Sequence, residues 1–338
     1  MATYASIWTQ FFPPRDSAPV TEVNVPSQAG RIFIVTGGSS GLGFELSRIL
    51  YSAGGKVYLL TRTQKNAEEA IAKIKARYDG RPGDRGSLEF IHMDQADLTS
   101  IHAAADEFLS KESRLDVLFN NAGTGALKNA PRTKQGNEYH FATNALGPFV
   151  LTRRLSPILA DTASKQPASS VRVIWAASLL VDTSSPKDGI RTEVLRDQDP
   201  KVHENELYSS SKTACWFLAS EFAKRSASEG VVHLAVNPGN YITNIWRHTP
   251  VFLYYLLWPI LRDPVQGAET YLWASLSEDV KVEDGVAGRY GIPVGRWHPG
   301  QRKDLVLALK NKEEGGSGKA DELFEWCLER DEDARSRL

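Results

Sequence analysis

The sequence predicts an α/β fold in which helices cover both faces of a doubly wound parallel sheet. Between about residues 31 and 236, short apolar runs alternate with longer helical stretches, an alternation typical of β-α repeats. A glycine-rich turn directly follows the first apolar run, as expected where a sheet of this kind begins. Because the alternation continues without a break, we expect one domain instead of two.

Six expected strands are each too short for a helix and are mostly β-branched or aliphatic: residues 32–35, 57–61, 88–92, 117–119, 171–175 and 231–236. The expected helices occupy residues 42–53, 66–78, 100–111, 138–159 and 206–228, with Asp97 or Thr99 as the N-cap of the third. We expect the domain to cover residues 31–292, between an N-terminal arm at 1–30 and a C-terminal appendage at 293–338.

The charge balance argues against two classes of partner. The chain has 338 residues, with 40 Lys and Arg against 41 Asp and Glu, which gives a net charge of -1. Such a chain has no global field that would draw it onto nucleic acid or an anionic membrane. We therefore expect no nucleic-acid partner.

Cysteine usage and the apolar runs bear on the compartment. Cys215 and Cys327 are too few for a disulfide framework or a cysteine-rich metal site, and we expect both to be reduced. The N-terminus lacks the charged and apolar regions of a signal peptide. The longest apolar run, residues 251–261, is shorter than the roughly 18 residues of a membrane span. These features predict a cytoplasmic chain without a bound metal.

The first predicted strand leads into the turn Thr36-Gly37-Gly38-Ser39-Ser40-Gly41-Leu42-Gly43. A strand, a glycine turn and a helix in this order form a phosphate site, because backbone N–H groups and the positive end of the helix face the ligand. We expect Gly37 to make the tight turn, Gly41 to admit the phosphates, and Gly43 to let helix and strand pack closely. The alternative is a flexible surface loop.

The end of the second strand indicates which dinucleotide this turn would bind. An acidic residue there accepts the ribose hydroxyls of NAD, whereas a basic residue favours the 2′-phosphate of NADP. The sequence has Leu60-Thr61-Arg62, and a guanidinium can bind a phosphate through two parallel hydrogen bonds. We therefore expect NADP(H) to be preferred over NAD(H); alternatively, Arg62 is a solvated surface charge.

Three side chains form a candidate catalytic set. Tyr208 and Lys212 lie four residues apart on a predicted helix and therefore share one face. An ammonium within roughly 4–6 Å lowers the pKa of a phenol by about 1–3 units, which makes tyrosine a usable general acid or base. Alone, such a pair occurs by chance on many solvated helices. Ser178 follows a buried strand at the sheet edge where open α/β folds bind ligands; alternatively, it caps a turn.

Together these motifs resemble the short-chain dehydrogenase/reductase family, whose members are single-domain Rossmann enzymes that use NAD or NADP. The glycine turn is similar to the family's TGxxxGxG motif, and the segment that starts at Tyr208 is similar to its YxxSK motif. The resemblance implies that Ser178 holds the substrate oxygen, that Tyr208 transfers a proton, and that Lys212 anchors the cofactor ribose.

Four further positions match motifs of the same family. Asn121 lies in a segment similar to the family's NNAG motif, which implies a place along the cofactor; alternatively, the segment is a simple turn at the end of a strand. Asp94 is implied to contact adenine or, alternatively, to cap a helix. Asn144 resembles an asparagine that kinks a helix, so that its backbone holds a water of the proton relay. Thr243 ends a PGxxxT stretch over the nicotinamide, and Gln95 departs from the usual aliphatic residue. The implied cofactor contacts are Gly37, Gly41, Leu42, Gly43, Arg62, Asp94, Asn121, Tyr208, Lys212 and Thr243.

Softer similarities point to fungal light-induced alcohol dehydrogenase-type members, which are related to the retinol dehydrogenases: Phe11-Phe12-Pro13-Pro14, Val171-Arg172-Val173-Ile174-Trp175, Pro238-Gly239-Asn240 and Gly291-Ile292-Pro293-Val294-Gly295-Arg296-Trp297. They imply a fungal oxidoreductase. Together with Arg62 and the aromatic stretch within residues 240–263, they lead us to expect an NADP(H)-dependent enzyme that interconverts a hydrophobic alcohol and its ketone or aldehyde. Polyketide or terpenoid tailoring in fungal secondary metabolism is one expectation, and retinoid or lipid carbonyls are another. The alternative class is a non-catalytic dinucleotide-binding regulator or scaffold of the same fold.

Two apolar segments allow more than one interpretation. For the aromatic stretch within residues 240–263, one interpretation is the wall of a substrate pocket. The alternatives are an ordinary core helix or a contact with a membrane surface. The tail at 310–338 is expected to be helical, and its apolar residues dock on the domain or pair with another subunit of a homo-oligomer: Leu323, Phe324, Trp326, Cys327 and Leu328.

Overall fold

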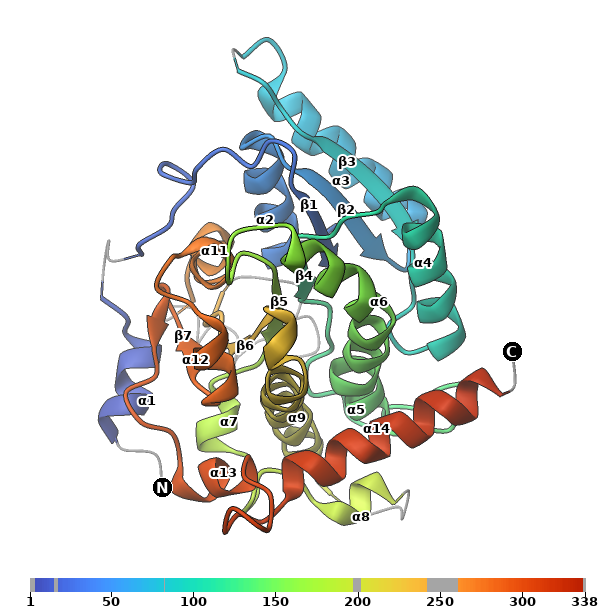
Figure 1. Ribbon diagram of the computed structural model, residues 1–338, viewed down its shortest axis with the longest axis vertical. Helices are drawn as coiled ribbons and strands as arrows, with labels where there is room; N and C mark the ends of the chain where they lie inside the picture. Colours follow the sequence, from blue (N-terminus) through green and yellow to red (C-terminus); the bar gives the residue numbers. More distant parts are fainter. Residues whose placement is uncertain (1–3, 15–17, 82, 197–201, 242–260, 337–338) are drawn as a thin grey trace.

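The structure is a computed structural model that describes residues 4–14, 18–81, 83–196, 202–241 and 261–336. A central sheet of eight strands lies in the middle of this part of the chain (Figure 1). The strand order is β3-β2-β1-β4-β5-β6-β7-β8. The first seven strands in this order pair in parallel, and β8 is antiparallel to β7. The order runs outward in both directions from β1 and β4, which confirms the predicted doubly wound α/β fold.

The six predicted strands are present, each within one residue of its expected ends: β1 Ile32–Thr36, β2 Lys56–Thr61, β3 Ser87–His92, β4 Val117–Asn120, β5 Arg172–Ala176 and β6 Val232–Val236. Two further strands, β7 Tyr290–Ile292 and β8 Arg296–Trp297, are too short to give a periodic signal in the sequence. Because β8 lies beyond residue 292, the sheet includes the first residues of the segment expected to be an appendage.

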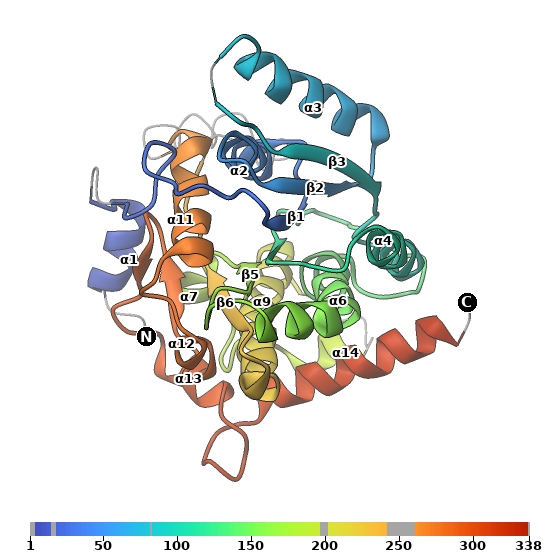
Figure 2. The same ribbon diagram turned by 45° about the horizontal axis from the view of Figure 1, so that its top comes forward.

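Helices cover the sheet on both faces (Figure 2). One face carries α2 Gly41–Ser52, α3 Gln64–Tyr78 and α11 Pro264–Leu276, and the other carries α4 Leu98–Lys111, α6 Gly147–Ser164 and α9 Glu204–Arg225. A separate apolar core fills each side of the sheet. Shorter helical turns complete the connections: α5 Tyr139–Phe141, α7 Leu180–Thr183, α8 Thr192–Leu195, η2 Ala227–Glu229, α12 Val282–Val286 and α13 Lys303–Ala308.

The helix predicted over residues 138–159 is interrupted, so the expectation of one continuous helix was wrong. A π-helical turn, η1 Ala142–Leu146, separates α5 from α6. Pro148 has no backbone N–H and cannot donate to the carbonyl of Asn144, which would be its α-helical acceptor. The thiol of Cys215 on α9 donates to that carbonyl instead, at 3.0 Å. The interruption therefore has a local and a tertiary cause.

The two ends of the chain pack on the domain. α1 Tyr4–Phe11 lies at the β8 edge, where Arg296 donates to the backbone oxygen of Thr9 at 2.9 Å. α14 Lys319–Arg335 runs beside α9 and also contacts α4 and α6 (Figures 1 and 2). Leu323 and Cys327 are fully buried within this one chain, so the docking interpretation of the tail holds for them.

The described part of the chain contains neither a membrane-spanning helix nor a cluster of metal-binding side chains. There, no helix is long and apolar enough to cross a membrane. No cluster of His, Cys, Asp and Glu suited to a metal ion occurs among the same residues. Both cysteines are free and buried.

A buried carboxylate fixes α14 in place. Asp331 accepts hydrogen bonds from His102 of α4 at 2.8 Å and Arg153 of α6 at 2.7 Å. Although burial disfavours the charged form, the hydrogen bond and charge of His102 and the charge of Arg153 lower the pKa of Asp331 below its usual range. The charged carboxylate therefore ties three helices together.

Asp331→Asn is expected to lower the free energy of unfolding by about 1–3 kcal/mol at neutral pH, because it weakens two buried hydrogen bonds. A carboxylate with a lowered folded-state pKa stabilises the fold above its unfolded-state pKa of about 3.9. The difference between the variant and the wild type should therefore shrink as pH falls through the lowered pKa. Urea unfolding measures this, with the exposed neighbour Asp333→Asn as control. Equal stability of the two variants at neutral pH contradicts the role of Asp331.

Candidate active site

The glycine turn has a shape that a side chain would obstruct. Gly37 and Gly41 have φ values of +68° and +55°, the left-handed region that glycine adopts without strain. A Cβ atom on Gly43 would lie 2.5 Å from the carbonyl oxygen of Gly37, so no other residue lets α2 approach the turn this closely. The turn follows β1 and leads directly into α2, as the sequence predicts.

The turn is braced by the strand ends beside it. The hydroxyl of Thr36, at the end of β1, donates to the carbonyl of Phe119 at 3.1 Å and accepts from the backbone N–H groups of Asn121 and Ala122. The Asn121 amide donates to the Thr36 carbonyl at 2.8 Å and accepts from Tyr271 of α11 at 3.1 Å. Asn121 therefore holds the glycine turn and the end of β4 at a fixed separation.

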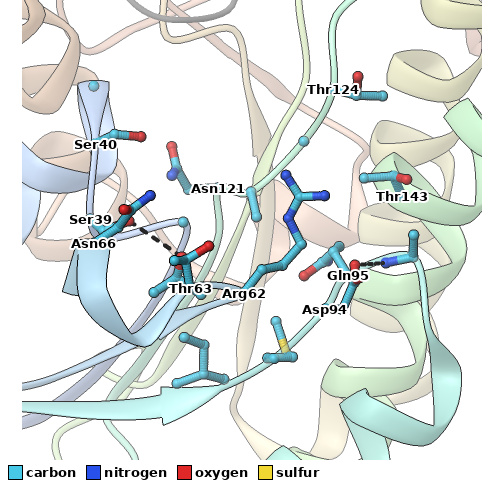
Figure 3. Close-up of a pocket in the computed structure, with 18 of the residues that line it drawn as sticks. Ser39, Ser40, Arg62, Thr63, Asn66, Asp94, Gln95, Asn121, Thr124 and Thr143 are labelled. Carbon is cyan, nitrogen blue, oxygen red and sulfur yellow. Dashed lines mark hydrogen bonds between the residues drawn. The ribbon is translucent and has the colours of Figure 1, made fainter.

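A pocket of about 350 Å³ opens at this edge of the sheet (Figure 3). It begins at the glycine turn, passes the ends of β2 and β3, and continues along residues 121–125 to Tyr139 and Thr143. Six of the predicted cofactor contacts line it: Gly37, Gly41, Leu42, Arg62, Asp94 and Asn121. Gly43 lies behind the turn, Tyr208 and Lys212 do not line the pocket, and Thr243 lies outside the described residues.

Arg62 follows the last residue of β2 and lines the pocket. This side chain is exposed, and its guanidinium reaches into the pocket without an ion pair or hydrogen bond to the described part of the chain (Figure 3). Ser39, Thr63 and Asn66 line the same region. The sequence interpretation named Arg62 alone, although these hydroxyl and amide groups stand in and just after the same two motifs. A phosphate would meet both charge and hydrogen-bond donors here.

Two buried polar side chains in the pocket wall lack partners. Neither the amide oxygen nor the amide nitrogen of Gln95 has a hydrogen bond within the described part of the chain, and the same holds for the Thr143 hydroxyl. An unpaired buried polar group costs about 1–3 kcal/mol, so such groups are rare without a ligand or water. The pocket therefore fits a dinucleotide, with phosphate donors at the turn, a cation at one end and unpaired polar groups along its wall.

Asp94, for which an adenine contact is predicted, lines the pocket and is partly hydrogen-bonded by the protein itself. One carboxylate oxygen accepts from the backbone N–H of Ala96 at 3.0 Å. The cap of α4 is Asp97, which accepts from Thr99, so Asp94 is not the helix cap that was its alternative interpretation. The second carboxylate oxygen of Asp94 can still meet a ligand in the pocket.

Lys212 connects α9 with the end of β5. Its ammonium, almost completely buried, donates to the carbonyl oxygen of Ala176 at 2.9 Å. A Cβ atom on Gly123 would lie 3.2 Å from this ammonium, which places Lys212 beside the inner end of the pocket. Tyr208 lies one turn earlier on the same helix and is 8% exposed. The predicted pair therefore lies at the carboxyl edge of the sheet.

Ser178 follows Ala176 by two residues at the same edge. Its hydroxyl oxygen accepts from the backbone N–H of Leu180 at 3.2 Å, so the serine does cap a turn, as its alternative interpretation predicts. This contact uses a lone pair and leaves the hydroxyl hydrogen available. The two interpretations of Ser178 are therefore compatible.

Asn144 lies within the π-helical turn and faces Lys212 across Gly123. Its amide oxygen accepts from the backbone N–H of Thr124 at 2.8 Å, and its amide nitrogen donates to Ser211 at 2.9 Å. Its backbone carbonyl, which accepts from Cys215, retains a second lone pair. The side chain therefore joins α9 to the segment after β4, and the backbone can accept one more donor.

Comparisons with known proteins agree with this architecture. Residues 31–180 match the family described as short chain dehydrogenase. The short-chain dehydrogenase/reductase bet4 of Neocamarosporium betae is 38% identical over 96% of this chain and 92% of its own length. The short-chain dehydrogenase/reductase iacJ of Pestalotiopsis fici is 36% identical over 97% of this chain and 98% of its own length. The chain therefore belongs to the short-chain dehydrogenase/reductase family, a family of oxidoreductases that bind NAD or NADP.

Solved structures show the same fold. The Pseudomonas aeruginosa RhlG/NADP active-site complex aligns with a TM-score of 0.59 and 25% identity, covering 80% of this chain and 98% of that one. A short-chain dehydrogenase from Sphingobium yanoikuyae in complex with NADPH aligns with a TM-score of 0.54 and 18% identity, covering 72% and 82%. The single Rossmann domain is therefore established.

Gly43→Ala is expected to weaken NADPH binding at least about tenfold, because the added methyl group displaces the carbonyl of Gly37 and distorts the turn. Calorimetric titration with NADPH measures the effect. Gly300→Ala is the matched control, since no atom lies within 4 Å of a Cβ there. If Gly43→Ala binds NADPH as tightly as this control, the turn is not the phosphate site.

Proposed function

We propose that the chain is an NADP(H)-dependent oxidoreductase that interconverts an apolar alcohol and the corresponding ketone or aldehyde. The hydrogen bond from Lys212 to Ala176 carries the proposal, because it joins the helix of Tyr208 to the strand that leads to Ser178. A binding module without turnover has no need for a phenol, a hydroxyl and a buried ammonium at one edge of its sheet.

The pocket residues would divide the dinucleotide between them. Backbone N–H groups of the glycine turn and the N-terminus of α2 would hold the diphosphate. Arg62, with Ser39 and Thr63, would hold the 2′-phosphate that distinguishes NADP from NAD. Gln95 would pair its free amide with the adenine side. When bound, the reduced dinucleotide supplies the hydride that reduces the carbonyl carbon.

The three catalytic candidates have complementary tasks. Ser178 can donate its free hydroxyl hydrogen to the substrate oxygen, since the backbone N–H of Leu180 occupies one of its lone pairs. Tyr208 transfers the proton to or from the same oxygen. Lys212 uses one of its three N–H donors on the carbonyl of Ala176 and keeps two that can bind the cofactor ribose. Its positive charge would also stabilise the ionised phenol of Tyr208.

Asn144 is proposed to support the proton path behind Lys212. Its side chain fixes Ser211, which directly precedes Lys212, and Thr124. Because Pro148 leaves the Asn144 carbonyl without a helical donor, one lone pair remains for a water beside the contact from Cys215. This water would replenish the proton that Tyr208 transfers.

Two regions are relevant to the class of substrate. The aromatic segment expected to wall the substrate site falls mostly at 242–260, outside the described residues. A second pocket of about 260 Å³ shares Tyr139 with the first and includes Leu207, the residue before Tyr208. Leu127, Val194 and Val202 give it an apolar part beside charged groups. Because its lining is mainly polar, this pocket does not by itself favour the apolar body of the proposed substrate. The apolar substrate class and a role in fungal secondary metabolism stay predictions.

Tyr208→Phe is expected to lower kcat by roughly 10²–10⁴-fold, because the proton donor is lost while the ring is kept. The dissociation constant for NADPH should stay near that of the wild type. NADPH absorbance, followed with a panel of apolar ketones and aldehydes and repeated with NADH, measures turnover. Tyr51→Phe, a tyrosine with the same 8% exposure on α2, is the control. Near wild-type turnover in Tyr208→Phe rejects the proposed function.

Arg62→Ala is expected to raise the dissociation constant for NADPH about 10- to 100-fold, since a charged hydrogen bond to phosphate contributes about 1.5–3 kcal/mol. Binding of NADH should not change, because NADH lacks the 2′-phosphate. Lys65 is the next cation along the chain after Arg62, and it is exposed at the start of α3. Lys65→Ala therefore controls for the loss of one positive charge. A parallel loss for both dinucleotides shows that Arg62 does not select NADP(H).

A further inference from the structure

A buried polar cluster lies behind Ser178 and has no part in the chemistry described above. It consists of Gln10 of α1, Asp182 of α7, Tyr290 of β7 and His298 just after β8. Gln10 and Tyr290 are each 2% exposed, and the side chains of Asp182 and His298 are 0% and 1% exposed. Three parts of the chain that are far apart in sequence, namely α1, α7 and the β7–β8 pair, thus bury polar groups together, which is costly unless these groups are hydrogen-bonded to one another.

Tyr290 forms hydrogen bonds with both backbone polar groups of Ser178, its C=O and its N–H. Its hydroxyl donates to the Ser178 carbonyl at 2.9 Å and accepts from the Ser178 backbone N–H at 3.1 Å. The last sheet hydrogen bond of this segment is the one from Ala177 to Val236, at 2.8 Å. Ser178 is therefore the first residue that the sheet no longer fixes, and the phenol takes the place of a strand partner.

The phenol itself is held firmly. Its ring packs edge-on against Trp216, with the ring centres 5.3 Å apart, and against His298, at 6.1 Å. Burial, with a smaller contribution from the charge of Asp182, raises the pKa of Tyr290 well above its usual range. The hydroxyl therefore keeps its proton at any working pH and can always donate to Ser178.

Asp182 fixes the helix that follows the serine, because it lies in α7, which begins two residues after Ser178. One carboxylate oxygen accepts from Gln10 at 2.8 Å and lies 3.0 Å from the ring nitrogen Nε2 of His298. The backbone N–H of His298 donates to the carbonyl of Tyr290 at 2.8 Å. His298 thus ties the strand that carries Tyr290 to the helix that follows Ser178.

Gln10 extends the cluster to the cofactor side of the site. Its amide oxygen accepts from Asn237 at 2.9 Å, and Asn237 in turn accepts from the backbone N–H of Gly239 at 3.0 Å. α1 therefore joins the serine segment to the turn after β6. The N-terminal arm is part of the support of the site and not a separate appendage.

We propose that Tyr290 is a positioning residue that holds the backbone of Ser178 where its hydroxyl can meet the substrate oxygen, and that Asp182, with His298 and Gln10, holds the helix beyond it. This role rests on the proposed function. A displacement of about 1 Å at a reacting group can cost about 10²-fold in rate, so the loss of one buried hydroxyl should be measurable in kcat.

A double-mutant cycle tests the proposal with Tyr290→Phe, Ser178→Ala and the combined variant. Tyr290→Phe is expected to lower kcat roughly 10- to 100-fold while KM for NADPH stays unchanged. In the Ser178→Ala background, the same substitution should change kcat by less than about threefold, since no hydroxyl is left to position. Asp182→Asn is a second variant that should follow the same pattern with a smaller loss.

Tyr58→Phe is the matched control, because it also removes a buried tyrosine hydroxyl, one that donates to Glu112 at 2.6 Å on the other half of the sheet. It should change stability without changing kcat. An equal loss from Tyr290→Phe in both backgrounds overturns the positioning role and leaves the proposed function intact. Equal turnover of the wild type and Ser178→Ala instead overturns the proposed function, and the positioning role with it.

Discussion

The buried hydrogen bond between the ammonium of Lys212 and the carbonyl of Ala176 is the contact on which the geometry of the site depends. A buried ammonium without a partner costs several kcal/mol, so this contact fixes how far α9 can slide along β5. Gly123 leaves room for the ammonium on its other side. Since Tyr208 precedes Lys212 by one turn and Ser178 follows Ala176 by two residues, one contact brings both side chains to the same edge of the sheet.

The π-helical turn before α6 supports the position of Lys212 from the side opposite Ala176. Asn144 lies where the chain departs from the regular α-helix, and its amide donates to Ser211 beside Lys212. Pro148 cannot donate to the backbone carbonyl of Asn144, and the thiol of Cys215 on α9 donates to this carbonyl instead. The break in the helix before α6 and the packing of α9 against it therefore depend on the same contact. The buried thiol thus acts as a donor within the fold instead of as a reactive group.

Local patterns in the sequence were sufficient for most of the fold. The six longer strands and the glycine turn depend on apolar runs and glycine spacing that lie within a few residues of each other. β7 and β8 are too short for such a pattern and exist because they pair with β6 and with each other. The break at Pro148 had a signal in the sequence, but the donor that compensates it comes from a helix 67 residues further along the chain, at Cys215.

The candidate site divides in the same way. Arg62, Tyr208 and Lys212 follow from short motifs, whereas the free amide of Gln95 and the cluster around Tyr290 depend on contacts between distant segments. Gln10 and Asp182 are 172 residues apart, and no spacing rule connects them. The candidate catalytic residues thus lie in recognisable motifs, while the residues proposed to hold them in place become visible only in the folded chain.

A crystal structure of the protein with bound NADP is the most direct test of the whole arrangement. We expect the diphosphate over the turn between Gly37 and Gly41, the 2′-phosphate at Arg62, and the nicotinamide ring beside Tyr208 and Ser178, with its ribose at Lys212. A nicotinamide ring that points away from these three side chains contradicts the account, even if the diphosphate lies on the turn.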